Sequence, residues 1–131
     1  MKILIVDDSA FTRKNIKSRL IGLPIEKKDF FEACSGLEAI ETFKKERPIM
    51  MILDLLMPGL SGEDTLRMAR VMKIPCFIVI HSSNFQKPVR ERLMTFGANL
   101  FLEKPINDEQ SRLLTKRFLE FIEDHGLTEE L

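Results

Sequence analysis

The sequence predicts an α/β protein in which a doubly wound parallel sheet carries helices on both faces. Short apolar runs alternate with amphipathic stretches five times along the 131 residues, which is the pattern of repeated strand–helix units. Several runs are apolar without interruption, as expected of strands that are covered on both sides. Right-handed crossovers between parallel strands then place helices on the two faces of the sheet. Neither a linker nor a low-complexity segment divides the chain, so we expect one domain over residues 1–125 and a short tail over residues 126–131.

The first half of the chain contains two of these strand–helix units. Residues 2–6 (KILIV) are the first expected strand, and a helix over residues 9–21 follows and ends before a Gly and a Pro. Residues 29–33 (DFFEA) are a second, weaker strand. Residues 35–38 (SGLE) are a capping box, in which a hydroxyl and a carboxylate satisfy free backbone N–H groups, so a helix is expected over about residues 36–46.

Three further units follow in the second half. Pro48 and Pro75 separate the third and fourth strands from the helices before them. Pro88 fits the first turn of the fourth helix, and Gly97 fits the position just past its end. The expected elements are strands over Ile49–Leu53, Cys76–Ile80 and Asn99–Leu102, and helices over about residues 63–72, about residues 87–96, and from Asn107 to about residue 125.

Composition and charge exclude several classes of function. Hydrophobic residues make up 44% of the chain and charged residues 31%, and the formal net charge is zero, so nothing suggests a nucleic-acid surface. The longest apolar runs have five residues, far short of the roughly 20 that span a bilayer, and the N-terminus lacks the pattern of a signal peptide. Cys34 and Cys76 fit no metal spacing, and we expect both to be small buried side chains of a cytoplasmic protein.

Polar residues follow the predicted strands at the point where each strand ends. After the first, third, fourth and fifth strands come, in turn, Asp7 and Asp8, Asp54, Ser82, and Lys104. Because ligands of open α/β sheets bind outside the carboxyl ends of the strands, we expect these side chains to converge on one edge. A lone acid at the end of an apolar strand is costly, so Asp54 is the most informative of them.

The chemistry of these groups points to phosphoryl transfer. Neighbouring carboxylates repel one another and raise each other's pKa values, and a divalent cation relieves that repulsion. Ligation by oxygen alone suits Mg²⁺, which keeps several waters and favours a phosphate partner. An Asp carboxylate can act as a nucleophile and form an aspartyl phosphate, while a Lys ammonium and a Ser hydroxyl can meet the phosphoryl oxygens. The residues therefore predict an aspartate that accepts a phosphoryl group.

These motifs, in this order, resemble the receiver domain of two-component response regulators over about residues 2–125. The motifs that carry the resemblance are Asp7-Asp8-Ser9 with Arg13, the run DLLMPGLSG from Asp54 to Gly62, Ser82, and Lys104-Pro105. The resemblance implies a flavodoxin-like, three-layer (βα)5 sandwich with strand order 2-1-3-4-5. It also implies a signalling switch rather than an enzyme, with a phosphohistidine on a sensor kinase or phosphotransfer domain as the donor.

The resemblance assigns roles to the acidic residues. Asp54 is the expected phosphoacceptor. Asp8, Asp54 and the backbone carbonyl of Leu56 would bind Mg²⁺ directly, and Mn²⁺ could substitute for it. Asp7 would act on the metal mostly through water.

The resemblance also implies a switch beside the acceptor. Ser82 would move to bond the phosphoryl group, with Ser83 as the alternative register, and Lys104 would form a salt bridge to it. Phe101 would then swing inward and act by packing alone, because it lacks the hydroxyl of a Tyr. A downstream protein would bind the surface of the fourth helix, fifth strand and fifth helix, with the chain a monomer or a phosphorylation-dependent dimer. The residues expected on that surface are Arg90, Glu91, Met94, Phe101, Glu103, Arg112 and Lys116.

Two positions bear on the loss of the phosphoryl group. Leu56 lies two residues after Asp54, and Asn84 lies two residues after Ser82, where the family places side chains that flank the attacking water. Leu56 has no polar group to orient that water, so we expect a relatively long-lived phosphoryl state.

The remaining singular residues have simpler interpretations. His81 adjoins Ser82, but a structural or exposed histidine is the expected interpretation, and we assign it no role. Most of the phenylalanines are expected in the core, namely Phe11, Phe30, Phe31, Phe43, Phe77, Phe96, Phe118 and Phe121.

Two other functions remain open on the sequence alone. A phosphohydrolase with an Asp nucleophile needs a second acid two residues later, but Leu56 follows Asp54 at that offset. A flavin-binding protein needs a phosphate-cradling loop after the first strand, where Asp7-Asp8 repels phosphate unless a metal is bound. The chain ends shortly after the last predicted helix, so we expect a stand-alone regulator, with a receiver excised from a longer regulator as the alternative.

Overall fold

The computed structural model describes residues 1–25, 27–83 and 86–127, over which strands and helices alternate. The strands are β1 (Lys2–Val6), β2 (Asp29–Ala33), β3 (Met50–Asp54), β4 (Phe77–Ser82) and β5 (Leu100–Glu103), and the helices are α1 (Ala10–Ile21), α2 (Gly36–Glu46), α3 (Gly62–Val71), α4 (Lys87–Thr95) and α5 (Asp108–Asp124). This order confirms the expected strand–helix alternation. The division into residues 1–125 and a tail over 126–131 stays a prediction, and residues 128–131 lie outside the described ranges.

Strands β3, β4 and β5 end later than the runs that predict them. The sequence places the end of the fourth strand at Ile80, but His81 and Ser82 continue it by pairing with Leu102 and Glu103 of β5. In the same way Asp54, expected just after the third strand, is its last residue and pairs with His81. Backbone hydrogen bonding, which does not depend on hydropathy, sets these ends. As a result Asp54 and Ser82 are held within the sheet, and not in loops after it.

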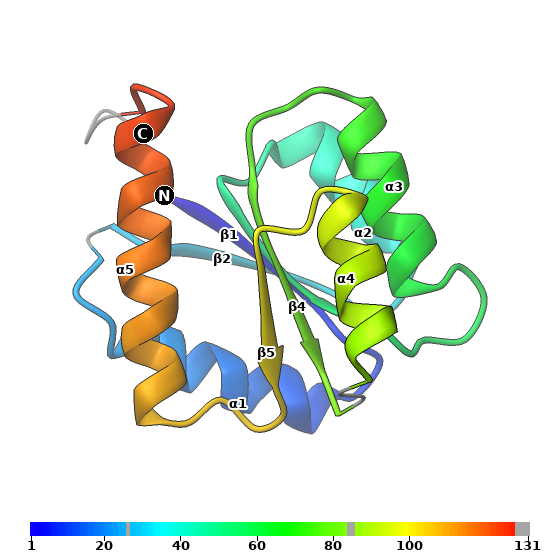
Figure 1. The fold of residues 1–131 in the computed structure, drawn as a ribbon, viewed down its shortest axis with the longest axis horizontal. Coiled ribbons are helices and arrows are strands. Elements are labelled where there is room, and N and C mark those ends of the chain that lie inside the picture. The colour runs from blue at the N-terminus through cyan, green and yellow to red at the C-terminus, as the bar shows by residue number, and fades with distance from the viewer. Residues whose placement is uncertain (26, 84–85, 128–131) are drawn as a thin grey trace.

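The five strands form one parallel sheet in the order β2-β1-β3-β4-β5, which confirms the expected doubly wound topology. Figure 1 shows α1 and α5 covering one face of this sheet, and α2, α3 and α4 covering the other. Because all strands run in the same direction, their carboxyl ends lie along a single edge of the sheet.

Two apolar clusters fix the helices on the sheet. On the face covered by α2, α3 and α4, Phe43 of α2 and Leu66 of α3 pack against the side chains of β1, β3 and β4 that point to that face. On the other face Ile16 of α1 and Phe118 of α5 pack against the alternate side chains of the same strands, and Phe118 meets Phe77 of β4 edge to face with ring centroids 5.6 Å apart. Full burial of one such side chain stabilises the fold by roughly 1.5–3 kcal/mol, so the two clusters hold the strands firmly in position.

Two expectations about burial are wrong. Cys34 is exposed, with its thiol 3.2 Å from a carboxylate oxygen of Glu38, because it lies after the end of β2 where the chain turns into α2. Phe11 is 74% exposed because the buried stripe of α1 passes through Ile16 and Leu20, and a residue five positions before Ile16 lies off that stripe.

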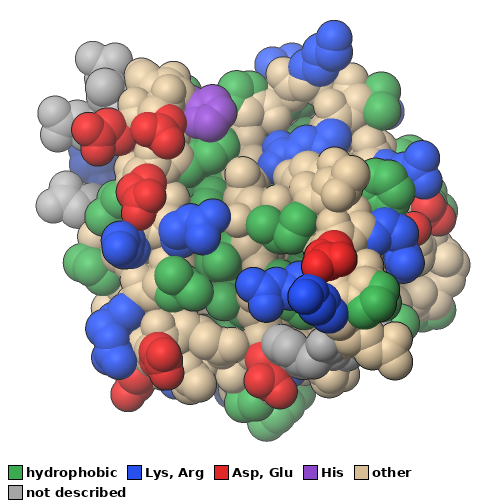
Figure 2. Space-filling view, in the orientation of Figure 1, with side chains coloured by type: hydrophobic (Ala, Val, Ile, Leu, Met, Phe, Trp, Pro, Cys, Tyr) green, Lys and Arg blue, Asp and Glu red, His purple; other side chains and the backbone are tan. Residues whose placement is uncertain are grey.

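The surface in the view of Figure 2 carries acidic and basic side chains among hydrophobic ones. None of the helices over the described residues is long and apolar enough to cross a membrane.

Candidate functional site

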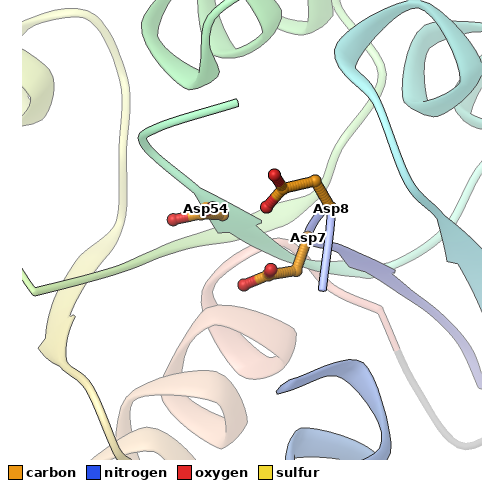
Figure 3. A group of neighbouring side chains, drawn as sticks. All are labelled: Asp7, Asp8 and Asp54. Carbon is orange, nitrogen blue, oxygen red and sulfur yellow. The ribbon is translucent and has the colours of Figure 1, made fainter. Parts of the chain in front are cut away.

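Three carboxylates meet at the carboxyl edge of the sheet, from residues far apart in the sequence. Asp7 and Asp8 follow the last residue of β1, and Asp54 ends the neighbouring strand β3. Figure 3 shows the three side chains next to one another at these strand ends. One oxygen of each carboxylate lies within 4.8 Å of the others, so a single cation could contact all three.

Lys104 provides a positive charge between two of these acids. It follows β5, and its Nζ lies 3.0 Å from Asp7 Oδ2 and 3.1 Å from Asp54 Oδ1. Asp7 is 1% exposed and Asp54 4% exposed, whereas Asp8 is exposed. The two buried acids therefore share one ammonium group, and Asp8 remains open to solvent.

Burial and neighbouring charges act in opposite directions on these groups. Burial raises the pKa of Asp54, and the negative charge of Asp7 raises it further, against the hydrogen bond from Lys104 and the backbone N–H of Leu56. Burial by itself would lower the pKa of Lys104, but its hydrogen bonds to Asp7 and Asp54 outweigh burial and raise it. Asp54 is thus a poorly solvated carboxylate that depends on Lys104 for its charge, and a second cation nearby would stabilise it further.

Asp7 is fixed by more than the lysine. The backbone N–H of Ser9 donates to Asp7 Oδ1 at 2.9 Å, so both carboxylate oxygens have partners within the chain. Arg13 donates to the backbone carbonyl of Asp7 at 2.7 Å and also pairs with Glu32 of β2. The hydroxyl of Ser9 accepts from the backbone N–H of Thr12 and caps α1, so the residue that bonds Asp7 also begins this helix. The position of Asp7 is therefore set before any ligand arrives.

The loop after Asp54 is held close to the sheet. The N–H of Gly62, the first residue of α3, donates to the carbonyl of Leu55 at 3.1 Å. A Cβ on Gly62 would lie 2.2 Å from the carbonyl oxygen of Asp54, so only glycine allows α3 to begin this close. Leu56 lies on this loop and is 66% exposed at the rim of the site.

The expected switch residues lie on the face of the sheet covered by α2, α3 and α4. Ser82 ends β4 and is buried, whereas Ser83, the alternative register, is exposed. Phe101 of β5 pairs with Ile80 and is buried in the cluster on that face. Asn84 lies outside the described residues.

Sequence reasoning gave no role to His81, which the structure places beside the acids. His81 is 2% exposed, pairs with Asp54 across the sheet, and has no hydrogen-bond partner on either ring nitrogen among the described residues. Burial, together with the charge of Lys104, lowers the pKa of His81 to about 4 against the opposing effect of Asp7. The two-residue repeat of a strand could have indicated which face His81 lies on. Side chains at alternate positions share one face of the sheet, so His81 lies on the same face as Phe77 and Val79, the face covered by α1 and α5.

We predict that His81 makes the fold sensitive to mild acid. Its pKa is about 4 in the folded chain and about 6.5 when unfolded, so the unfolded state binds the proton first and stability falls as the pH drops below 6.5. Between pH 7.5 and pH 5 this loss amounts to about 2 kcal/mol, and His81→Leu should remove it, as measured by urea unfolding at both pH values. The exposed His125 gives the matched control His125→Leu, which should keep the pH dependence of the wild type. An equal loss in wild type and His81→Leu would contradict a neutral buried imidazole.

Comparison with known proteins assigns the chain to a family. The family model for the response regulator receiver domain matches residues 3–116. A CheY chemotaxis protein from Thermotoga maritima is 32% identical over 106 residues, which cover 79% of this chain and 85% of that protein. The signal receiver domain of a putative Luxo repressor protein from Vibrio parahaemolyticus superposes with a TM-score of 0.79 at 28% identity and covers 98% of both chains.

A second kind of relative is much longer than this chain. A protein-glutamate methylesterase/protein-glutamine glutaminase from Pyrococcus abyssi is 36% identical over 107 residues, which are 80% of this chain and 28% of that protein. The likeness to this relative is therefore confined to a part of it the size of one receiver domain. The family model covers all five strands and the acidic edge of the sheet, and the chain belongs to the response regulator receiver domains of two-component signalling, with a CheY-like fold.

Proposed function

We propose that this receiver domain accepts a phosphoryl group on Asp54 from a phosphohistidine of a sensor kinase or phosphotransfer protein. The observation that carries the proposal is the buried Asp54 carboxylate, which lies 3.1 Å from the ammonium of Lys104 and beside two further acids. Catalysis of phosphoryl transfer depends mainly on positioning the reactants and on stabilising the negative charge of the transition state. The poorly solvated Asp54 carboxylate suits the role of nucleophile, and the nearby Lys104 ammonium can bind the phosphoryl oxygens.

The acids fit a magnesium site. All donors near Asp54 are oxygens, which Mg²⁺ prefers, and Asp8 is exposed and so accessible to a hydrated ion. Asp8, Asp54 and the carbonyl of Leu56 would hold the ion, with Mn²⁺ as a substitute, and Asp7 would act through water because its own oxygens are already engaged. When bound, the ion would neutralise negative charge on the phosphoryl oxygens.

The bonds that change in the transfer are those of the Asp54 carboxylate and of the donor. An oxygen of Asp54 attacks phosphorus, so an O–P bond forms while the N–P bond to the donor imidazole breaks. The donor leaves as a neutral imidazole after it takes up one proton from water. Lys104 then pairs with a phosphoryl oxygen, which requires only a small displacement because its Nζ already contacts Asp54. Turnover of phosphate esters is not part of this function, since Leu56 lies where an Asp-nucleophile phosphohydrolase carries its second acid.

We propose that the phosphorylated site changes the packing of Ser82 and Phe101 and, through them, the surface of α4, β5 and α5. Figure 2 shows this side of the molecule, on which Lys and Arg side chains lie among hydrophobic ones. Met94 and Leu113 are exposed on α4 and α5, which gives a partner apolar contacts. To move the two packings from a ratio of 1:99 to 99:1 takes about 5.5 kcal/mol, which several charged contacts to a phosphoryl dianion can supply. The surface would bind a downstream protein or a second copy of the chain.

Phosphorylation of Asp54 can be measured directly by intact mass. After incubation with acetyl phosphate and Mg²⁺ the protein should gain one phosphoryl group, and it should gain none when the metal is chelated. Asp54→Asn should stay unmodified because it lacks the nucleophilic carboxylate, whereas the exposed Asp124→Asn on α5 should be modified like the wild type. Modification of Asp54→Asn, or no modification where another receiver domain is labelled, would contradict the proposal.

The exposed side chain of Leu56 should prolong the phosphoryl state, because it cannot orient an attacking water. We expect a half-life of minutes or longer for the wild type, and a several-fold shorter one for Leu56→Asn, when loss of the added mass is followed after the acetyl phosphate is removed. Leu37 on α2 is equally exposed, 66% for both residues, and Leu37→Asn is the matched control that should decay like the wild type. A wild-type half-life of seconds would show the expectation to be wrong.

A further inference from the structure

Three side chains of α3 lie in one stripe and reach the second half of α4 or the loop after it. Glu63, Arg67 and Arg70 are spaced four and three residues apart, so they share one face of α3. Glu63 accepts from Arg92 of α4, with 2.7 Å between Oε1 and Nε. The Cζ of Arg67 lies over the ring of Phe96, just after α4, at 4.5 Å from the ring centroid. The C-terminal end of α4 is therefore fastened to α3 by two charged contacts.

Arg70 fastens the loop after α4. It donates to the backbone carbonyls of Gly97 and Cys76 at 2.8 and 3.0 Å, and to the side-chain oxygen of Asn99 at 2.7 Å. The same Asn99 oxygen accepts from the backbone N–H of Ile78, so one network joins α3 to the starts of β4 and β5. Gly97 has a φ of +108°, which favours glycine, and a Cβ there would lie 2.9 Å from the Arg70 side chain. A glycine thus suits both the turn and the close approach of Arg70.

The first half of α4 has no charged contact of this kind. Among the described residues, the only ion pair of residues 87–91 is Lys87–Glu91, which lies within the helix itself and spans 3.9 Å. Val89 packs on the apolar cluster of this face but is only partly buried, and the buried residue of α4 is Leu93, in its second half. Apolar contacts hold the first half of α4 in place, and such contacts are not directional.

The two halves of α4 also differ in their distance from the acidic edge of the sheet. Figure 1 shows α4 beginning near the carboxyl ends of β4 and β5 and running toward the opposite edge. It is the next helix after Ser82, which ends β4, and Phe101 lies in the apolar cluster on which Val89 packs. A change in the packing of Ser82 and Phe101 therefore acts on the loosely held half of α4, and the fastened half lies farther away.

We propose that the C-terminal end of α4 is a fixed pivot, held on α3 by Glu63, Arg67 and Arg70, and that α4 turns about it so that its N-terminal half is the part that moves. The movement on phosphorylation rests on the proposed function, whereas the pivot belongs to the unphosphorylated chain as well. The surface of α4, β5 and α5 therefore changes around Arg90, and it keeps its shape around Phe96.

Distances between pairs of nitroxide labels on the full chain test the pivot. Lys45→Cys on α2 carries the reference label, and the second label is carried by Arg90→Cys in the first half of α4 or by Thr95→Cys at its end. All three positions are exposed, and Cys34→Ser removes the exposed native thiol, while Cys76 is buried. Double electron–electron resonance then gives the mean and the width of each distance distribution.

The unphosphorylated chain tests whether the charged contacts hold the end of α4. Joint replacement of the three cations, Arg67→Met, Arg70→Met and Arg92→Met, should broaden the distribution of the label at Thr95 about twofold, because the contacts that fix this end are lost. Lys87→Gln breaks the ion pair within α4 and is the matched control that should leave this distribution unchanged. If the triple variant does not fold, Arg67→Met with Arg92→Met decides the question. An unchanged width in the folded variant overturns the pivot.

Phosphorylation tests which half of α4 moves. After incubation with acetyl phosphate and Mg²⁺, and with one added phoshoryl group confirmed by intact mass, the mean distance to the label at Arg90 should shift by about 2 Å, and that to the label at Thr95 by less than about 1 Å. A shift at Thr95 as large as that at Arg90, or no shift at either label in the phosphorylated chain, overturns the proposal. If no mass is gained, the proposed function fails, and the widths in the unphosphorylated chain still decide whether the pivot exists.

Discussion

Two carboxylates buried side by side need a cation between them, and the arrangement of this site follows from that need. Asp7 and Asp54 end neighbouring strands with almost no exposure to solvent, where an unpaired charge would be very costly. The Nζ of Lys104 lies about 3 Å from a carboxylate oxygen of each acid and forms an ion pair with both. Both oxygens of Asp7 have hydrogen-bond partners, whereas burial and the negative charge of Asp7 raise the pKa of Asp54 against the hydrogen bond from Lys104. We therefore propose that the site responds to a further cation or to a phosphoryl group that draws Lys104 away.

The fold holds Asp7, Asp54 and Lys104 in fixed positions relative to one another. The parallel sheet brings the ends of β1, β3 and β5 to one edge, and two apolar clusters hold those ends rigid. Ser9 and Gly62 bring the starts of α1 and α3 close to Asp7 and Asp54. Asp8 and Leu56, at the rim of the site, are exposed to solvent, whereas Asp7 and Asp54 are buried.

Most of the fold could be predicted from the sequence, because the apolar runs, prolines and capping residues each have a local physical meaning. The convergence of Asp7, Asp54 and Lys104 followed from strand ends alone. The burial of Phe11 and Cys34 was predicted wrongly, because residue type does not say which side of a helix or turn faces the core. The burial of His81 beside the acids was missed. It depends on the backbone pairing of His81 and Ser82 with β5, which extends β4 two residues beyond its apolar run.

The most direct test of the account is the effect of Mg²⁺ on the unfolding free energy of the wild type and of Asp8→Asn. Asp8 is exposed, so this variant leaves the core intact, and without divalent ions it should be at least as stable as the wild type because one repulsive charge is gone. At a Mg²⁺ concentration of about 100 times its Kd the wild type should gain about 2.7 kcal/mol, as should the exposed Asp29→Asn control, while Asp8→Asn should lose most of that gain. Equal gains in all three proteins would contradict an acidic edge built to hold a cation.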